Sequence, residues 1–156
     1  MVKNYNFVLD VDGVLTNGKF LYSQDGKLMK EFGAHDAYSL KKISSSLNIQ
    51  FISADKRGFS ISEKRITDMG FKLTLVSEDE RFSYIKERFS LENLIYMGDG
   101  DADAKVLKDS FIGIAPKNSR PSALNAANYV TELTGGNGAV AEACDYLEQK
   151  LLNRNT

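Results

Sequence analysis

Cysteine and histidine are almost absent from this sequence of 156 residues. The single cysteine, Cys144, has no partner for an internal disulfide, and we expect it to be a small buried residue of a helix. With only one histidine besides, the chain holds no residue cluster typical of a zinc site. These absences are typical of a reduced compartment, and we expect a cytoplasmic location.

An excess of charge of one sign is also missing. Twenty lysine and arginine residues face 21 aspartate and glutamate residues, which gives a formal net charge of −1. This balance argues against the positive surface typical of non-specific nucleic-acid or membrane binders. No apolar stretch approaches the roughly 20 residues needed to span a bilayer, and no signal segment opens the sequence. We therefore expect neither a nucleic acid nor a membrane as partner.

What is present is an ordinary globular composition, 42% hydrophobic and 26% charged. Short apolar runs rich in β-branched and aromatic residues predict buried strands at residues 7–11, 49–52, 73–76, 94–97, 111–114 and 129–130. Helical spacing predicts helices at residues 39–47, 62–69, 81–89, 101–108 and 139–152. The alternation predicts an α/β fold with a mostly parallel sheet, and no linker divides the single domain over residues 1–156. A β-hairpin over residues 20–32, turning at Asp25-Gly26, interrupts the alternation.

Two carboxylates follow the first expected strand, in Asp10-Val11-Asp12-Gly13-Val14-Leu15-Thr16. Charges at the end of a buried strand are costly without compensation, and ligands of open parallel sheets bind at that end. Carboxylate oxygens suit Mg²⁺, and of two carboxylates one can attack phosphorus while the other transfers a proton. An acidic helix-capping loop and a metal-binding Asp-x-Asp motif of the glycosyltransferase type are open alternatives at this point.

A second acidic cluster, Gly98-Asp99-Gly100-Asp101-Ala102-Asp103, follows the strand expected at residues 94–97. If that strand lies beside the first, Asp99 lies next to Asp10 and completes a metal site. Three acids at one point need a cation to avoid mutual repulsion. Two such clusters favour a phosphoryl-transfer site over a chance acidic turn.

Together the two clusters resemble the DxDGxxT and GDGxxD motifs of the haloacid dehalogenase-like hydrolase superfamily. The resemblance covers nearly the whole chain and is greatest to the capless branch of 3-deoxy-manno-octulosonate 8-phosphate phosphatases, with support from the hairpin and from residues 32–36 and 135–140. It implies a three-layer, Rossmann-like, doubly wound and mostly parallel sheet, with a hairpin after the first strand and no cap domain. It also implies Mg²⁺-dependent hydrolysis of a small sugar-phosphate monoester. Such a substrate is a keto-deoxy sugar acid phosphate or a related precursor of lipopolysaccharide or another surface polysaccharide.

The resemblance also implies roles for individual residues. Asp10 would be the nucleophile that forms an aspartyl-phosphate, and Asp12 would protonate the leaving oxygen and later deprotonate water. Mg²⁺ would be held by Asp10, by the backbone carbonyl of Asp12 and by Asp99. Asp103 would orient a metal-bound water or a neighbouring side chain, and Ser53 would donate a hydrogen bond to phosphate.

The segment after Ser53 departs from the family pattern. Ala54-Asp55 stand where the branch usually has Gly-Arg, and Ala54 is kept as a phosphate-side candidate. Lys56 or Arg57 is expected to supply the missing positive charge, although a solvated basic turn is an equal alternative.

The lysine of the third family motif is missing as well. Arg81 is the nearest cation, and we expect it to contact both phosphate and a carboxylate, because Lys86 lies more than a helical turn later. His35, the only histidine, is a candidate on the substrate side. The nucleophile and metal groups are intact, so the resemblance predicts retained chemistry and leaves the sugar open.

Capless relatives of this branch assemble as tetramers in which the hairpin of one subunit covers a neighbour's site. The apolar hairpin residues Phe20, Leu21, Tyr22 and Leu28 suit such a homotetramer, and packing against their own domain is the alternative. A non-catalytic oligomerisation or binding module of the same fold is the competing function, favoured by the missing lysine. A receiver-type signalling domain is the third, and the DxDGxxT spacing does not fit it.

Overall fold

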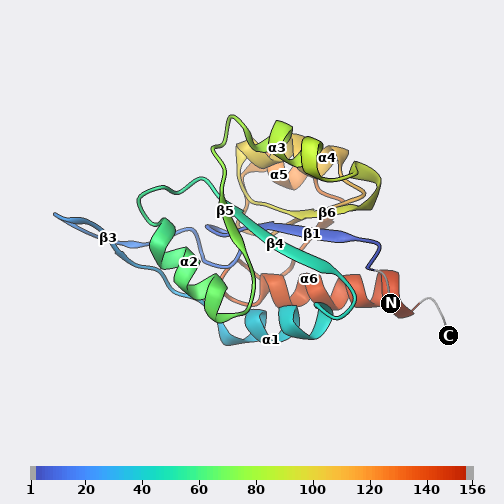
Figure 1. The fold of residues 1–156 in the computed structure, drawn as a ribbon, viewed down its shortest axis with the longest axis horizontal. Coiled ribbons are helices and arrows are strands. Elements are labelled where there is room, and N and C mark those ends of the chain that lie inside the picture. Colours follow the sequence, from blue (N-terminus) through green and yellow to red (C-terminus); the bar gives the residue numbers. More distant parts are fainter. Residues whose placement is uncertain (1–2, 154–156) are drawn as a thin grey trace.

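Six strands lie side by side in a sheet whose neighbouring strands all run parallel (Figure 1). The computed structural model of the protein describes residues 3–153. The order across the sheet is β5-β4-β1-β6-β7-β8. The strands are β1 (Asn6–Asp10), β4 (Asn48–Ser53), β5 (Leu73–Leu75), β6 (Leu94–Met97), β7 (Ile112–Ala115) and β8 (Tyr129–Val130). The prediction of a mostly parallel sheet is therefore confirmed.

Helices cover both faces of this sheet because successive strand residues point to opposite sides. Phe7 and Leu9 pack into one buried cluster, with α1 (Ala34–Ile43), α2 (Phe59–Asp68) and α6 (Ala139–Leu147). Val8 packs into the other, with α3 (Arg81–Arg88), α4 (Ala104–Asp109) and α5 (Pro121–Ala126). Figure 1 shows α3, α4 and α5 on one side of the sheet and α1 and α6 on the other. The result is the expected three-layer, doubly wound architecture.

The chain reverses its direction of travel across the sheet at β1, which pairs with β4 on one side and with β6 on the other. The carboxyl ends of these three strands therefore form a crevice of the kind that binds ligands in open α/β sheets. Between β1 and β4, the structure places only a two-stranded hairpin, β2 (Leu21–Ser23) and β3 (Gly26–Met29), and the helix α1. No cap domain lies in that interval, as expected.

Several boundaries differ from those predicted. The hairpin turns at Gln24 and Asp25, one position earlier than expected, because Gly26 already pairs with Ser23. The helix expected from residue 101 begins as a 3-10 turn, η2 (Asp101–Asp103), and the one expected to reach residue 152 ends in a π-helical segment, η3 (Glu148–Leu152). A further 3-10 turn, η1 (Leu91–Asn93), precedes β6.

Two helical segments escaped prediction for physical reasons. The helix α1 begins at Ala34, five residues before the predicted start, and its first turn contains the buried Asp36. The Asp36 carboxylate accepts a hydrogen bond from the backbone N–H of Ala141 at 2.9 Å, so it caps the N-terminus of α6 from another helix. The helix α5 is only six residues long and starts with Pro121. Among residues 3–153, no helix is long and apolar enough to cross a membrane.

Candidate active site

A cavity of about 570 Å³ opens at the carboxyl ends of β1, β4 and β6. Charged and small residues from five segments of the chain line it: Asp10, Asp12, Lys27, Ser53, Ala54, Asp55, Ser77, Glu78, Asp79, Arg81, Asp99, Gly100 and Ala102. Six of the predicted site residues are among them, namely Asp10, Asp12, Ser53, Ala54, Arg81 and Asp99. The structure therefore brings both acidic motifs to one place.

Asp10 is the last residue of β1, and it is buried. One of its carboxylate oxygens accepts a hydrogen bond from the backbone N–H of Val11 at 2.8 Å, and the other lies 3.4 Å from the guanidinium of Arg81. Burial raises the pKa of Asp10 well above its usual value, Arg81 lowers it, and the charges of Asp103 and Asp99 raise it further. Arg81 alone therefore does not supply enough positive charge to offset the effect of burial and of the neighbouring acids on the pKa of Asp10.

Asp99 belongs to an acidic cluster of three residues. Carboxylate oxygens of Asp10, Asp99 and Asp103 all lie within 4.8 Å of one another. Burial and then the charge of Asp103 raise the pKa of Asp99 to about 7. A divalent cation between these carboxylates would remove the repulsion, and hard oxygen ligands are those that Mg²⁺ prefers. The residues present therefore fit a Mg²⁺ ion.

Gly13 lets the two motifs meet. Its φ of +84° suits glycine, and a Cβ at this position would lie 1.8 Å from a carboxylate oxygen of Asp99. Close packing also requires a glycine at position 135, since a Cβ there would lie 2.2 Å from the carbonyl oxygen of Gly13. Close packing therefore explains why glycine occupies position 13 in the first motif and position 135 in the segment 135–140.

Asp103 lies behind the cavity with both carboxylate oxygens occupied. One accepts hydrogen bonds from Arg81, at 2.6 Å, and from the hydroxyl of the buried Tyr96. The other accepts the backbone N–H groups of Asp99 and Gly100 at 3.0 and 2.9 Å. With four donors in place, Asp103 is better suited to orient its neighbours than to coordinate a metal directly.

Arg81 begins α3 and its side chain is only 3% exposed. Its guanidinium bridges Asp103 and Asp10, which suits the cationic role predicted for it. Burial by itself would lower the pKa of Arg81, but Asp10, Tyr96 and Asp103 raise it above its usual value. The arginine is therefore charged at every physiological pH.

Lys30 contacts the site residue Asp12, although the sequence patterns did not identify it. Its ammonium lies 2.8 Å from a carboxylate oxygen of Asp12, 2.8 Å from Asp55 and 2.9 Å from the hydroxyl of Ser62. The lysine directly follows β3, within the predicted hairpin, and it was not among the predicted site residues. Only the folding of the hairpin against α2 places it here.

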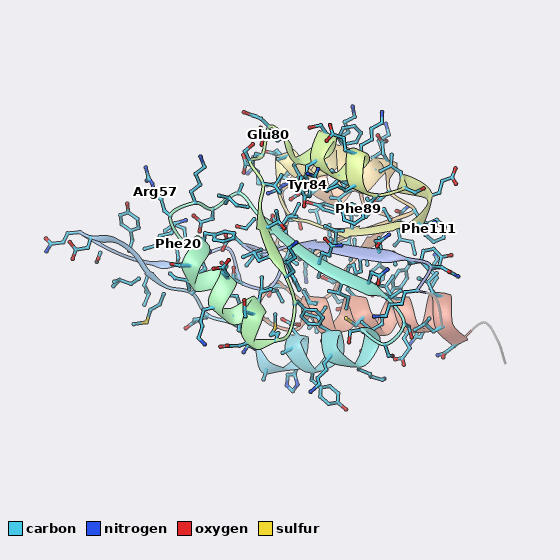
Figure 2. All side chains as sticks on the ribbon, viewed as in Figure 1. Phe20, Arg57, Glu80, Tyr84, Phe89 and Phe111 are labelled. Carbon is cyan, nitrogen blue, oxygen red and sulfur yellow. The ribbon has the colours of Figure 1, made fainter. Side chains whose placement is uncertain are left out.

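Of the two open interpretations of Lys56 and Arg57, a source of positive charge for the site or a solvated basic turn, their positions favour the turn. Lys56 and Arg57 are exposed and do not line the cavity, and Figure 2 shows Arg57 extending away from the body of the molecule. Lys27 of the hairpin lies 2.7 Å from Asp55 instead and lines the cavity. Burial would raise the pKa of Asp55, but hydrogen bonds from Lys27 and Lys30 lower it to about 2.

Ser53 is the last residue of β4 and is buried beside Ala54 at the cavity. Its hydroxyl oxygen accepts the backbone N–H of Asp55 at 3.1 Å, which leaves the hydroxyl hydrogen available to a ligand. His35 lies on the exposed first turn of α1 and does not line the cavity. Cys144 is buried in α6 and does not line the cavity, and burial raises its pKa to about 12.

Comparison with known proteins agrees with this geometry. The family model of haloacid dehalogenase-like hydrolases matches residues 80–143. The 3-deoxy-D-manno-octulosonate 8-phosphate phosphatase of Escherichia coli K12 is 30% identical over 146 residues, covering 90% of this chain and 77% of the relative. The corresponding phosphatase of Yersinia pestis is 27% identical with the same coverage.

Solved structures show the same fold. The 3-deoxy-D-manno-octulosonate 8-phosphate phosphatase of Moraxella catarrhalis, in complex with magnesium, phosphate and the sugar, has a TM-score of 0.83 and 26% identity, covering 94% of this chain and 87% of that one. The cobalt-bound deoxy-D-mannose-octulosonate 8-phosphate phosphatase of Haemophilus influenzae has a TM-score of 0.81 and 28% identity, covering 94% of this chain and 89% of that one.

Proposed function

Because this chain belongs to the haloacid dehalogenase-like hydrolases, in the family of 3-deoxy-D-manno-octulosonate 8-phosphate phosphatases, we propose that it is a Mg²⁺-dependent phosphatase of a small sugar-phosphate monoester. The first candidate substrate is 3-deoxy-D-manno-octulosonate 8-phosphate, and related surface-sugar precursors are next. One observation carries the proposal: the carboxylates of Asp10 and Asp99 converge in a cavity where Arg81 contacts Asp10.

Asp10 is the nucleophile in this proposal. Its carboxylate oxygen attacks phosphorus, the bond from phosphorus to the sugar oxygen breaks, and Asp12 gives its proton to that departing oxygen. An aspartyl-phosphate on Asp10 results. Water then attacks the phosphorus, Asp12 accepts a proton from this water, and the bond between Asp10 and phosphorus breaks to release phosphate.

The surrounding residues hold the phosphoryl group in line for these steps. Arg81 neutralises oxygens of the phosphoryl group and keeps Asp10 oriented, and Ser53 donates a hydrogen bond to phosphate. Asp10, Asp99 and the backbone carbonyl of Asp12 would hold Mg²⁺, which supplies positive charge for the oxygens of the transferring group. Asp103 orients Arg81 and the backbone of Asp99.

Leaving-group contacts are assigned to the residues that line the outer cavity. Lys27 is a new candidate there, and Ala54 remains a candidate on the phosphate side. Lys56 and His35 lie outside the cavity of a single chain, so we assign them no contact with substrate. Glu78 and Asp79 add negative charge to the rim of the cavity.

We further propose that residues 1–156 form one domain, that four copies assemble in the cytoplasm, and that each hairpin covers a neighbouring site. Large apolar side chains of the hairpin are exposed in the single chain: Phe20, Leu21, Tyr22, Leu28 and Met29. Their burial in an assembly would stabilise it and would shield an open cavity from water. Light scattering should give the mass of a tetramer.

A non-catalytic module is disfavoured by the same geometry. The chain retains the nucleophile, the proton carrier and Asp99, and Arg81 occupies the position beside Asp10 that the missing lysine left open. A chain that had lost catalysis would have no need to keep three carboxylates in one cavity, with Arg81 beside Asp10 and Lys30 beside Asp12.

Phosphate release from a panel of monoesters tests the proposed function. We expect hydrolysis of 3-deoxy-D-manno-octulosonate 8-phosphate or another sugar phosphate, and of p-nitrophenyl phosphate, in the presence of Mg²⁺. Chelation by EDTA should abolish the reaction and added Mg²⁺ should restore it. Absence of phosphate release from every monoester, with Mg²⁺ present and the protein folded, would refute the proposal.

Magnesium affinity should depend on pH through Asp99. Its pKa of about 7 in the metal-free protein means that protons compete with the metal below that pH. We therefore expect the dissociation constant of Mg²⁺ to rise as the pH falls below 7, by about tenfold per pH unit for the proton on Asp99 and more steeply where Asp10, whose pKa is also raised, takes up a proton as well. Calorimetric titration at several pH values measures this, and an affinity that is constant from pH 5.5 to pH 8 would contradict it.

A further inference from the structure

We propose that Lys30 is the positioning residue of the proton carrier, holding the carboxylate of Asp12 toward the leaving group from the hairpin side. The inference rests on the proposed function and adds to it a residue that no catalytic motif of the family marks. Lys30 does not line the cavity, so it acts through Asp12 and not on the substrate.

The first support is the fixed position of the ammonium. The Lys30 side chain is 0% exposed, and its three N–H groups have three acceptors: Asp12 at 2.8 Å, Asp55 at 2.8 Å and Ser62 at 2.9 Å. A buried cation with all of its donors satisfied has little freedom to move. Lys30 is therefore a rigid anchor, set between the hairpin, the loop after β4 and the helix α2.

The second support is that, among residues 3–153, no other residue holds the Asp12 carboxylate by a hydrogen bond or ion pair. It lies beyond the end of β1, and its side chain is 31% exposed. Among residues 3–153, Lys30 is the sole hydrogen-bond partner of its carboxylate. A proton carrier must lie within hydrogen-bond reach of the oxygen it protonates, so the residue that restricts its rotation sets the rate of proton transfer.

The third support is the separation of this network from the nucleophile. Asp10 and its cluster are held by Arg81, Asp103 and the backbone of Val11, and none of these residues shares a hydrogen bond or ion pair with Lys30. Loss of the lysine should therefore impair proton transfer to the leaving group while phosphate binding and nucleophilic attack are retained.

The leaving group gives a test that separates positioning from general damage. A sugar alkoxide needs a proton in order to leave, whereas p-nitrophenolate is a weak base that leaves without one. In Lys30→Met, we expect kcat/KM to fall about 100-fold for the best-hydrolysed sugar phosphate of the panel, and about tenfold at most for p-nitrophenyl phosphate. The ratio of the two values is the readout, because kcat/KM covers only the steps up to departure of the leaving group.

Two further variants complete the experiment. Ser62→Ala, which removes a fully buried acceptor of Lys30, should shift the ratio in the direction of Lys30→Met by a smaller factor. Ser60→Ala, on the exposed face of the same helix, should leave it unchanged.

The outcomes are distinct. Equal losses on both substrates in a folded Lys30→Met would overturn the role of Lys30 and leave the proposed function standing. If Lys30→Met does not fold, Ser62→Ala decides, and an unchanged ratio there overturns the role. Failure of the wild-type chain on every monoester would instead refute the proposed function itself.

Discussion

Replacement of Asp10 by asparagine is expected to lower kcat by at least about 10⁴-fold, whichever phosphate monoester is used. The amide has nearly the same shape as the carboxylate but is a far weaker nucleophile toward phosphorus. The fold should survive, because the asparagine oxygen can still accept the backbone N–H of Val11. Burial raises the pKa of Asp10, so its charge is costly in the metal-free protein, and the free energy of unfolding should not fall.

The matched control for this variant is Asp101→Asn. Asp101 belongs to the second acidic cluster, yet its side chain is 67% exposed, and its hydrogen-bond and ion-pair partners among residues 3–153 are Ser122 and Arg120. Its replacement should leave kcat within about twofold of the wild type, since surface substitutions away from a site have small effects. Measurable Mg²⁺-dependent turnover in Asp10→Asn, with Asp101→Asn fully active, would show that another group attacks phosphorus.

Replacement of Arg81 by methionine is expected to affect both activity and stability. The buried carboxylates of Asp10 and Asp103 would lose the cation that lies between them. Removal of one partner from such a buried group costs about 3–5 kcal/mol of stability, and loss of a charge that stabilises the transition state costs on the order of 10²–10³-fold in kcat. Urea unfolding and steady-state kinetics measure the two effects.

Arg81→Lys separates the charge from the shape of the guanidinium. The family pattern has a lysine in this role, so the ammonium should restore most of the stability and bring kcat to within about tenfold of the wild type. Arg88→Met is the control, because Arg88 lies at the end of the same helix with an exposed side chain. If Arg81→Met kept wild-type activity, Arg81 would have no part in phosphoryl transfer.

The two acidic motifs and the strands that carry them were predictable because their patterns are local. Apolar runs of strand length marked β1 and β6, and the carboxylates follow directly at their ends. Parallel strands place such ends at one edge of a sheet, and the pairing of β1 with β6, which the sequence patterns left as a condition, brings Asp10 and Asp99 together.

The contacts that the sequence did not reveal depend on tertiary packing. Lys30 lies in the predicted hairpin outside any recognised motif, and only the folding of that hairpin against α2 gives it three acceptors, on Asp12, Asp55 and Ser62. Tyr96 reads as a core aromatic, and its hydroxyl finds Asp103 only after the chain has turned through residues 98–103. The start of α1 was missed because its first turn buries a charged residue, Asp36. The partner of Asp36 is the N-terminus of a helix about a hundred residues away, which the local pattern could not show.

The phosphoenzyme itself is the most direct test of the central claim that Asp10 carries the phosphoryl group. The enzyme would be mixed with Mg²⁺ and a hydrolysed monoester, quenched in acid within milliseconds, digested and analysed by mass spectrometry. We predict phosphate on the peptide that contains Asp10, formed transiently and absent from Asp10→Asn. Phosphate bound to a different residue, or multiple turnovers without any phosphorylated peptide under conditions that trap an acyl phosphate, would contradict this account.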